Sequence, residues 1–214
     1  MSDEVRTGSK YSTLLTDIGG VCISNPYIFV AEYIENNYGI DAGHAYQVMK
    51  LNAREFDAGK ISFRVFAEIT LRSIGVDMDP GRFSAIHDRG LREKTDVISL
   101  YRKVKKQNNV RIVALSNMPE YTWKLIRGFK GIGDLFDFTV LSYQHMMLKP
   151  DRRLFDVALQ TAGTLSARCL FVDDAIENVE AANNIGILSH LYSSTEKLMG
   201  FLEHNGLICD TKSC

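Results

Sequence analysis

The sequence has few cysteines, almost no net charge and no long apolar run. Its four cysteines, Cys22, Cys169, Cys209 and Cys214, lack the spacing of a metal-binding pair and are too sparse for a disulfide framework. The formal net charge of -1 argues against a general electrostatic hold on nucleic acid or on an anionic membrane. No apolar stretch is long enough to span a bilayer, and the polar N-terminal segment contains no apolar signal region. We therefore expect a cytoplasmic protein, a monomer or homodimer, with neither nucleic acid nor membrane as a partner.

The composition that remains is that of an ordinary globular protein. Hydrophobic residues make up 45% of the 214 residues and charged residues 24%, so the chain can bury a substantial core. This length is enough for one domain, or for one domain with a modest insertion.

The stretch from Ser12 to Val21 is the most informative part of the chain. A short apolar run leads into Asp17 and is followed by Gly19 and Gly20, which predicts a buried strand with the aspartate at its carboxyl end. Open parallel sheets bind ligands at that end of their strands. The two glycines would let main-chain groups approach an ion or phosphate closely. Taken alone, this stretch is equally compatible with an aspartate that only caps a turn.

The rest of the chain divides into two patterns. Residues 27–93 read as four helices without a strand, which predicts a small helical bundle inserted over residues 25–95. From residue 96 onward, helices alternate with apolar strands at 110–115, 138–141, 169–172 and 187–192. This alternation predicts an α/β fold with a doubly wound parallel sheet, built from residues 1–24 and 96–214.

Polar side chains stand where several predicted strands end, and a lysine stands ahead of a later helix. These residues are Asp17, Ser116, Asn117, Lys149, Asp173 and Asp174, with Asn178 one helical turn further on. Because parallel strands bring their carboxyl ends to one edge, the separated segments can converge on one crevice. Each residue also has an ordinary structural interpretation, such as a turn, a helix cap or a solvated lysine. The ordered set is far more specific than any single member.

The segments TDIGGV, ALSN, LKPD and FVDDAIENV, in this order, resemble the haloacid dehalogenase-like hydrolase superfamily over most of the chain. The insertion at 25–95 resembles the small helical cap, of the C1 type, of that family. The resemblance implies a magnesium-dependent hydrolase of a small phosphomonoester, with a small phosphorylated metabolite as its partner.

The resemblance also implies a role for each residue. Asp17 would attack phosphorus and form an aspartyl-phosphate, and Lys149 would stabilise the transferring group. Magnesium would be held by the carboxylates of Asp17 and Asp174 and the carbonyl of Gly19, with Asp173 acting through water or a hydrogen bond. The residues expected to bind phosphate or substrate are Ser116, Asn117, Gly20 and Asn25, with Arg54 and Lys60 as further polar candidates near the mouth of the cap.

The match departs from the family at Gly19. Many phosphatases of the family carry a second aspartate there, which acts as general acid and base; such assistance contributes roughly 10²–10⁴-fold. A glycine cannot transfer a proton. Either the enzyme strongly favours substrates with good leaving groups, such as aryl phosphates, or another group assists the reaction in place of the missing acid. The candidates for that group are Ser24, Asn25 and a residue of the cap.

Four other functions stay open at this point. The metal-free dehalogenase branch of the family lacks the paired acids, so Asp173 and Asp174 favour phosphate over halide. A phosphomutase is disfavoured because phosphoryl transfer in both directions relies on the missing acid. A binding or regulatory protein with weak or no turnover, or non-hydrolytic chemistry on an anionic or diphosphate metabolite, is compatible with Gly19. Metal-dependent phosphate release would separate a hydrolase from a binding or regulatory protein and from an enzyme with non-hydrolytic chemistry.

Overall fold

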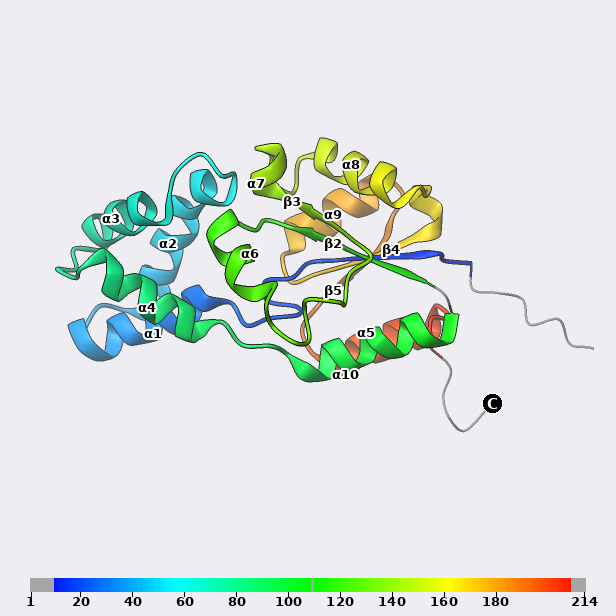
Figure 1. Cartoon of the computed structure of the whole chain (residues 1–214), viewed down its shortest axis with the longest axis horizontal. Helices are drawn as coiled ribbons and strands as arrows, with labels where there is room; N and C mark the ends of the chain where they lie inside the picture. The colour runs from blue at the N-terminus through cyan, green and yellow to red at the C-terminus, as the bar shows by residue number, and fades with distance from the viewer. Residues whose placement is uncertain (1–9, 109, 209–214) are drawn as a thin grey trace, which may run out of the picture.

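A five-stranded, wholly parallel sheet lies at the centre of the larger part of the molecule (Figure 1). The computed structural model describes residues 10–108 and 110–208. The strands are β1 (Thr13–Thr16), β2 (Arg111–Ser116), β3 (Phe138–Leu141), β4 (Cys169–Asp173) and β5 (Leu188–Leu191). Their order is β3-β2-β1-β4-β5, so the first strand of the chain lies in the middle, paired with β2 and β4.

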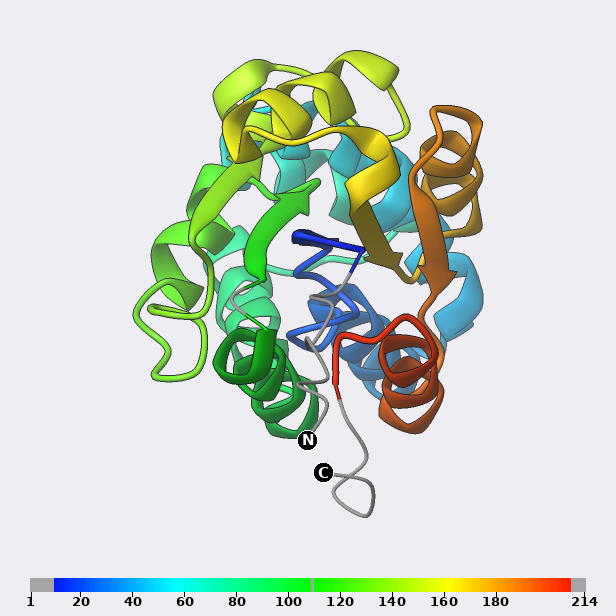
Figure 2. The ribbon, with the colours of Figure 1, turned by 90° about the vertical axis from the view of Figure 1, so that its right-hand side faces the viewer.

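Helices cover both faces of this sheet, as Figure 2 shows. One face carries α5 (Thr95–Asn108) and α10 (Thr195–His204), and the other carries α8 (Arg152–Ala162) and α9 (Ile176–Asn184). Successive strand residues point to opposite faces, so Leu14 packs with α5 and α10 whereas Leu15 packs with α8 and α9. The predicted doubly wound α/β fold is confirmed.

The core unit also contains two shorter helices on the side of the inserted helices, α6 (Glu120–Ile126) and α7 (Ser142–His145) (Figure 1). The 3-10 turn η1 (Ser166–Arg168) leads into the start of β4. Ile126 of α6 reaches the same hydrophobic cluster as α5 and α10.

The predicted insertion forms four helices with their own hydrophobic cluster. These helices are α1 (Pro26–Tyr38), α2 (Ala42–Asp57), α3 (Phe63–Ile74) and α4 (Pro80–Gly90). Ser62 and Asp79 cap α3 and α4, because each side chain accepts hydrogen bonds from main-chain N–H groups of the first turn. The rings of Phe56 and Phe66 stack with centroids 4.9 Å apart inside the bundle.

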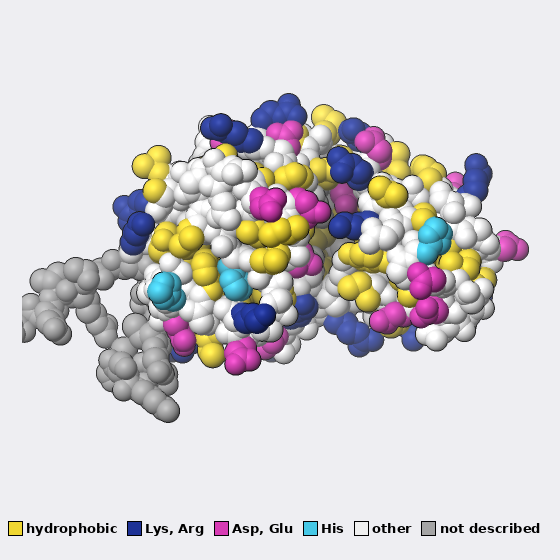
Figure 3. All heavy atoms as spheres, turned by 180° about the vertical axis from the view of Figure 1, so that it is seen from behind, with side chains coloured by type: hydrophobic (Ala, Val, Ile, Leu, Met, Phe, Trp, Pro, Cys, Tyr) yellow, Lys and Arg dark blue, Asp and Glu magenta, His cyan; other side chains and the backbone are white. Residues whose placement is uncertain are grey.

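The inserted helices have a hydrophobic cluster separate from the two clusters on the faces of the sheet, which supports the division that we propose, with a core unit at 1–24 and 96–214 and a helical cap at 25–95. The chain passes between the units twice, and the two crossing segments pair through the antiparallel bridge of Ile23 with Glu93. The view from behind shows acidic and basic side chains interspersed on both units and a hollow between them (Figure 3).

The predictions about cysteines and membrane spans are tested only in part. Cys22 and Cys169 are buried and free, whereas Cys209, Cys214 and the segment assessed for a signal region lie outside the described residues. Among the helices of the described ranges, none combines the length and the apolarity needed to cross a membrane.

Candidate active site

The structure brings the strand-end residues together at the carboxyl edge of the sheet. Asp17 follows the central strand, Ser116 ends β2 and Asp173 ends β4. The Ser116 hydroxyl donates a 2.6 Å hydrogen bond to Asp17 Oδ1, which also accepts one of 2.7 Å from the main-chain N–H of Ile18. The convergence expected from the sequence is therefore present.

Lys149 lies between two carboxylates and has a fully buried side chain. Its Nζ is 2.6 Å from Asp173 Oδ2 and 3.2 Å from Asp17 Oδ1. Burial lowers the pKa of Lys149, but the negative charges of Asp17 and Asp173 outweigh that effect and raise the pKa above its usual 10.5. The ammonium group is thus charged at neutral pH.

Asn117 holds the main chain of Lys149 in place. The N–H of Lys149 donates to Asn117 Oδ1 at 2.7 Å, and Asn117 Nδ2 donates to the carbonyl of Lys149 at 3.1 Å. The Asn117 side chain, which the sequence predicted to bind substrate, is engaged in positioning the lysine, although the residue still lines the pocket.

Both oxygens of Asp173 are engaged with protein groups. Oδ1 accepts from the N–H of Ala175 at 2.8 Å, and Asn178 Nδ2 lies 3.0 and 3.1 Å from Oδ1 and Oδ2. Lys149 contacts Oδ2. This arrangement supports the prediction that Asp173 acts through hydrogen bonds, and it gives Asn178 a positioning role.

The residues present fit a magnesium ion. Asp17, Asp173 and Asp174 each offer an oxygen, and these oxygens lie within 4.8 Å of one another. Magnesium prefers such oxygen ligands and usually keeps several waters. The side chain of Asp174 approaches Gly20 so closely that a Cβ on Gly20 would lie 2.0 Å from Asp174 Oδ2. Gly20, expected from the sequence to approach phosphate, is the residue that leaves room for this carboxylate.

Without a bound cation, the surroundings of the Asp17 carboxyl disfavour its ionised form. The pKa of Asp17 is raised from 3.8 to about 7, because burial and the negative charges of Asp173 and Asp174, which raise it, outweigh the positive charge of Lys149, which lowers it. The hydrogen bond from Ser116 lowers it slightly further. A divalent cation near these carboxylates would favour their ionised forms and neutralise their mutual repulsion.

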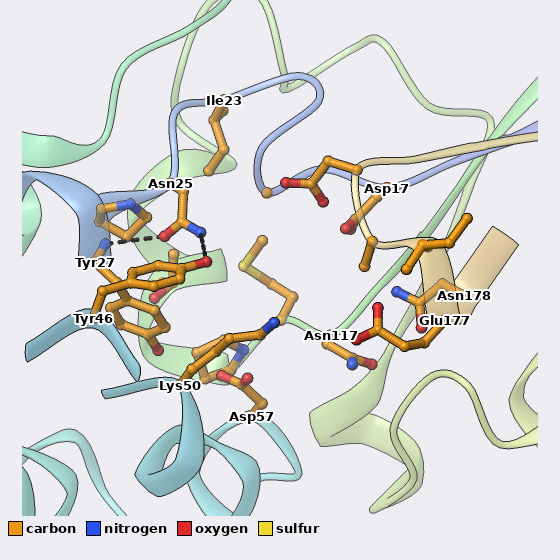
Figure 4. A pocket seen from close by; sticks show the side chains of 18 of the residues that line it. Asp17, Ile23, Asn25, Tyr27, Tyr46, Lys50, Asp57, Asn117, Glu177 and Asn178 are labelled. Carbon is orange, nitrogen blue, oxygen red and sulfur yellow. Dashed lines mark hydrogen bonds between the residues drawn. The ribbon is translucent and has the colours of Figure 1, made fainter. Parts of the chain in front are cut away.

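A cavity of about 510 Å³ opens between this edge and the cap (Figure 4). On the core side its lining includes Asp17, Gly19, Asn117, Met118, Asp174 and Glu177. On the cap side its lining includes Asn25, Tyr27, Tyr46, Lys50, Asp57 and His87. The sequence-predicted Arg54 and Lys60 line a separate hollow of about 270 Å³.

Asn25 stands at the junction of the two walls. Its Oδ1 accepts from the N–H of Tyr27 at 3.0 Å, which caps α1, and its Nδ2 donates to the Tyr46 hydroxyl at 3.4 Å. Its proposed role in binding substrate would therefore add to a role as a helix cap.

Sequence reasoning missed the cap-side residues Tyr46, Lys50, Asp57 and His87. They belong to helices without a recognisable motif, and tertiary packing alone aims them at the pocket. One signal was available: Asp57 is the last residue of α2, where a carboxylate meets the negative end of the helix dipole. A carboxylate at the electrostatically unfavourable end of a helix is a candidate functional residue.

The fold and the site together define an α/β protein with a cluster of carboxylates around a buried lysine at the carboxyl edge of its sheet. The family of haloacid dehalogenase-like hydrolases matches residues 13–186, which is most of the chain. The chain therefore belongs to this hydrolase family, as the resemblance of the four segments predicted.

Individual relatives agree with this assignment. Over 110 residues the chain is 34% identical to the sesquiterpene phosphatase astK of Aspergillus oryzae, in a match that covers 51% of this chain and 56% of that protein. The alignment thus spans little more than half the length of that relative.

Solved structures share the fold at low sequence identity. A HAD family enzyme of Bacteroides thetaiotaomicron, crystallised as its magnesium complex, has a TM-score of 0.70 at 22% identity and covers 90% of this chain and 98% of its own. The L-2-haloacid dehalogenase of Xanthobacter autotrophicus, with chloropropionic acid covalently bound, has a TM-score of 0.66 at 18% identity. The match covers 93% of this chain and 85% of the dehalogenase chain.

Proposed function

We propose that this hydrolase is a magnesium-dependent phosphatase that cleaves a small phosphomonoester through an aspartyl-phosphate on Asp17. One observation carries the proposal: the buried Lys149 between Asp17 and Asp173, with the carboxylate of Asp174 beside them. A dianionic phosphate repels a carboxylate nucleophile, and a fixed ammonium group beside that nucleophile opposes the repulsion.

Each side chain has a part in this reaction. An Asp17 oxygen attacks phosphorus, Lys149 and the Ser116 hydroxyl stabilise the oxygens of the transferring group, and Asp173 holds the lysine in place. Magnesium, held by Asp17 and Asp174 with the Gly19 carbonyl, would supply positive charge to the phosphoryl group.

The phosphatase function is favoured over a metal-free dehalogenase and over a binding protein without turnover. A metal-free dehalogenase has no use for the acidic pair Asp173–Asp174, and the likeness to a dehalogenase structure concerns the fold alone. A binding protein without turnover has no need of a buried charged lysine beside a nucleophile, because keeping such a group desolvated is costly.

The pocket and the curated relative also suggest a substrate class. Ile23, Met118, Ile176 and Leu191 give the pocket apolar walls. A phosphate ester of an apolar alcohol would bury its carbon part there, which is compatible with the sesquiterpene phosphatase relative.

The test is phosphate release from a panel of aryl, alkyl, sugar and isoprenoid phosphates, with magnesium and with excess chelator. We expect release that requires magnesium and that is lost in Asp17→Asn. Full dehalogenation of a 2-haloacid in chelator would assign the metal-free branch instead. Phosphate binding without release from any substrate would assign a binding protein.

A further inference from the structure

The position where many relatives carry an acid is open space in this protein. A Cβ placed on Gly19 would meet no heavy atom within 4 Å. The reaction proposed above still needs a proton for the leaving oxygen and a base for the attacking water. The pocket must therefore supply that group from elsewhere, if alkyl phosphates are substrates.

The cap contributes one carboxyl group to the wall of the pocket, that of Asp57. Figure 4 shows Asp57 on the cap side and Asp17 across the cavity from it. Asn25 and Ser24, the other groups considered from the sequence, are engaged elsewhere. Asn25 caps α1 and contacts Tyr46, while the Ser24 hydroxyl donates to the carbonyl of Gly90 at 2.5 Å.

Asp57 is attached to the core on the side of the active site. The Ser142 hydroxyl, at the start of α7, donates to the main-chain carbonyl of Asp57. The same oxygen accepts a 2.9 Å hydrogen bond from the N–H of Met118, the second residue after Ser116. One buried hydroxyl thus joins the end of α2 to the loop that carries Ser116 and Asn117.

The packing of the turn after α2 also holds the end of this helix against the core. A Cβ on Gly59 would lie 3.1 Å from the Cβ and the carbonyl oxygen of Tyr143, so the turn after α2 lies tightly against α7. Asp57 therefore belongs to the cap in sequence but is held at a defined place relative to the nucleophile's loop.

The electrostatic surroundings suit a proton donor. Burial raises the pKa of Asp57 well above 3.8, and the negative charge of Asp17 raises it further. A raised pKa favours the protonated carboxyl, which is the form that a general acid needs.

We propose that Asp57 is the general acid and base of this enzyme and replaces, from the cap, the acid that Gly19 lacks. The inference rests on the proposed phosphatase function and adds to it the group that handles the proton.

The proton balance is simple. When Asp17 attacks phosphorus, the bond from phosphorus to the leaving oxygen breaks, and that oxygen takes the proton of the Asp57 carboxyl to become an alcohol. In the second step water attacks the aspartyl-phosphate, its proton returns to the Asp57 carboxylate, and the bond from phosphorus to Asp17 breaks. Inorganic phosphate and the starting enzyme result.

The experiment compares the wild type with Asp57→Asn on phosphates whose leaving groups span a wide range of pKa. The change keeps the size of the side chain, and the contact with Ser142 survives because it uses the main chain. We expect alkyl phosphate turnover to fall by about 10² or more. With 4-nitrophenyl phosphate, whose leaving group needs no proton, we expect a burst of 4-nitrophenol followed by slow turnover, because the aspartyl-phosphate accumulates without its base.

Asp77→Asn is the matched control, since it makes the same change at an exposed position of the cap. It should leave both substrates unaffected. An equal loss on all leaving groups without a burst, or no loss, would overturn the role of Asp57 while leaving the phosphatase proposal intact. A wild type that releases no phosphate would contradict the proposed function itself and, with it, the inference.

Discussion

At the scale of single residues, the site depends on what two adjacent glycines leave out. Gly20 adopts φ +74 and leaves space for the Asp174 carboxylate, whereas Gly19 leaves an empty volume in the pocket wall. Gly20 leaves room for a proposed metal ligand, and Gly19 leaves the pocket without a carboxyl group at that position. The two positions therefore respond to a new side chain in different ways.

Gly20→Ala should weaken magnesium binding, because its Cβ would lie 2.0 Å from Asp174 Oδ2 and displace that carboxylate. Gly39→Ala is the control: its φ of +71 carries a similar backbone cost, roughly 1 kcal/mol, with no neighbour within 4 Å. Calorimetric titration with magnesium measures the affinity of each variant. Equal affinities would show that Asp174 does not bind the metal.

Gly19→Asp should restore alkyl phosphate turnover to Asp57→Asn. The new side chain enters open space beside Asp17, where it can deliver the proton that Asp57 no longer supplies. Steady-state rates on one alkyl and one aryl phosphate are the measurement, with Gly19→Asn in the same background as the control of equal size. Equal recovery by Gly19→Asn would mean that the effect is not proton transfer.

At the scale of helices and strands, the two walls of the pocket differ in how far the sequence predicts them. Asp17, Ser116 and Asp173 follow strands, and a parallel sheet places all strand ends on one edge, so the alternating pattern was enough to bring them together. The contacts of Asn117 with Lys149 were not predictable, because they depend on the path of a loop. Asp57 lies on a helix whose orientation is set by packing against α1, α3 and α7, which no local pattern encodes.

The bundle contains a buried histidine that makes its stability depend on pH. His87 is 1% exposed and packs against Phe63 and Tyr27. Burial lowers its pKa below the usual 6.5, and Asp88 only partly opposes this. Below about pH 6.5 the unfolded chain therefore binds a proton on His87 that the folded protein does not. The neutral buried imidazole contributes to the stability of the folded protein above about pH 6.5, and this contribution is lost as the pH falls below that value.

His87→Phe should accordingly reduce the loss of stability in acid. Between pH 7 and pH 5 we expect the free energy of unfolding of the wild type to fall by up to about 1.4 kcal/mol per pH unit more than that of the variant. Urea unfolding at several pH values measures this difference. His44→Phe, at an exposed position of α2, is the control and should keep the wild-type slope. Parallel slopes for His87→Phe and the wild type would contradict the argument.

At the scale of the whole molecule, the two units are joined by the paired crossing segments at Ile23 and Glu93, by Tyr121 of α6, and by the Ser142 hydroxyl between Met118 and Asp57. The Tyr121 hydroxyl donates a 2.8 Å hydrogen bond to Asp88 of α4, and its ring centroid lies 4.3 Å from that of Phe63. Removing the Ser142 hydroxyl would leave a buried N–H and a carbonyl without this partner, which costs about 1–3 kcal/mol.

Ser142→Ala should therefore lower both the stability of the protein and the turnover of alkyl phosphates, with a smaller effect on aryl phosphates. Thermal unfolding and the ratio of the two turnover rates are the measurements. Ser73→Ala is the control, because its hydroxyl bonds only to the carbonyl of Ile69 within α3. A stability loss with an unchanged ratio would separate Ser142 from proton transfer.

These attachments link substrate entry to the proposed proton transfer. If the cap moves away from the core to admit a substrate, the contact of Ser142 with Asp57 breaks and the proposed proton donor moves away from Asp17. An ester bound in such an open form would meet an incomplete set of reacting groups, so cleavage would begin only after the cap had closed over it.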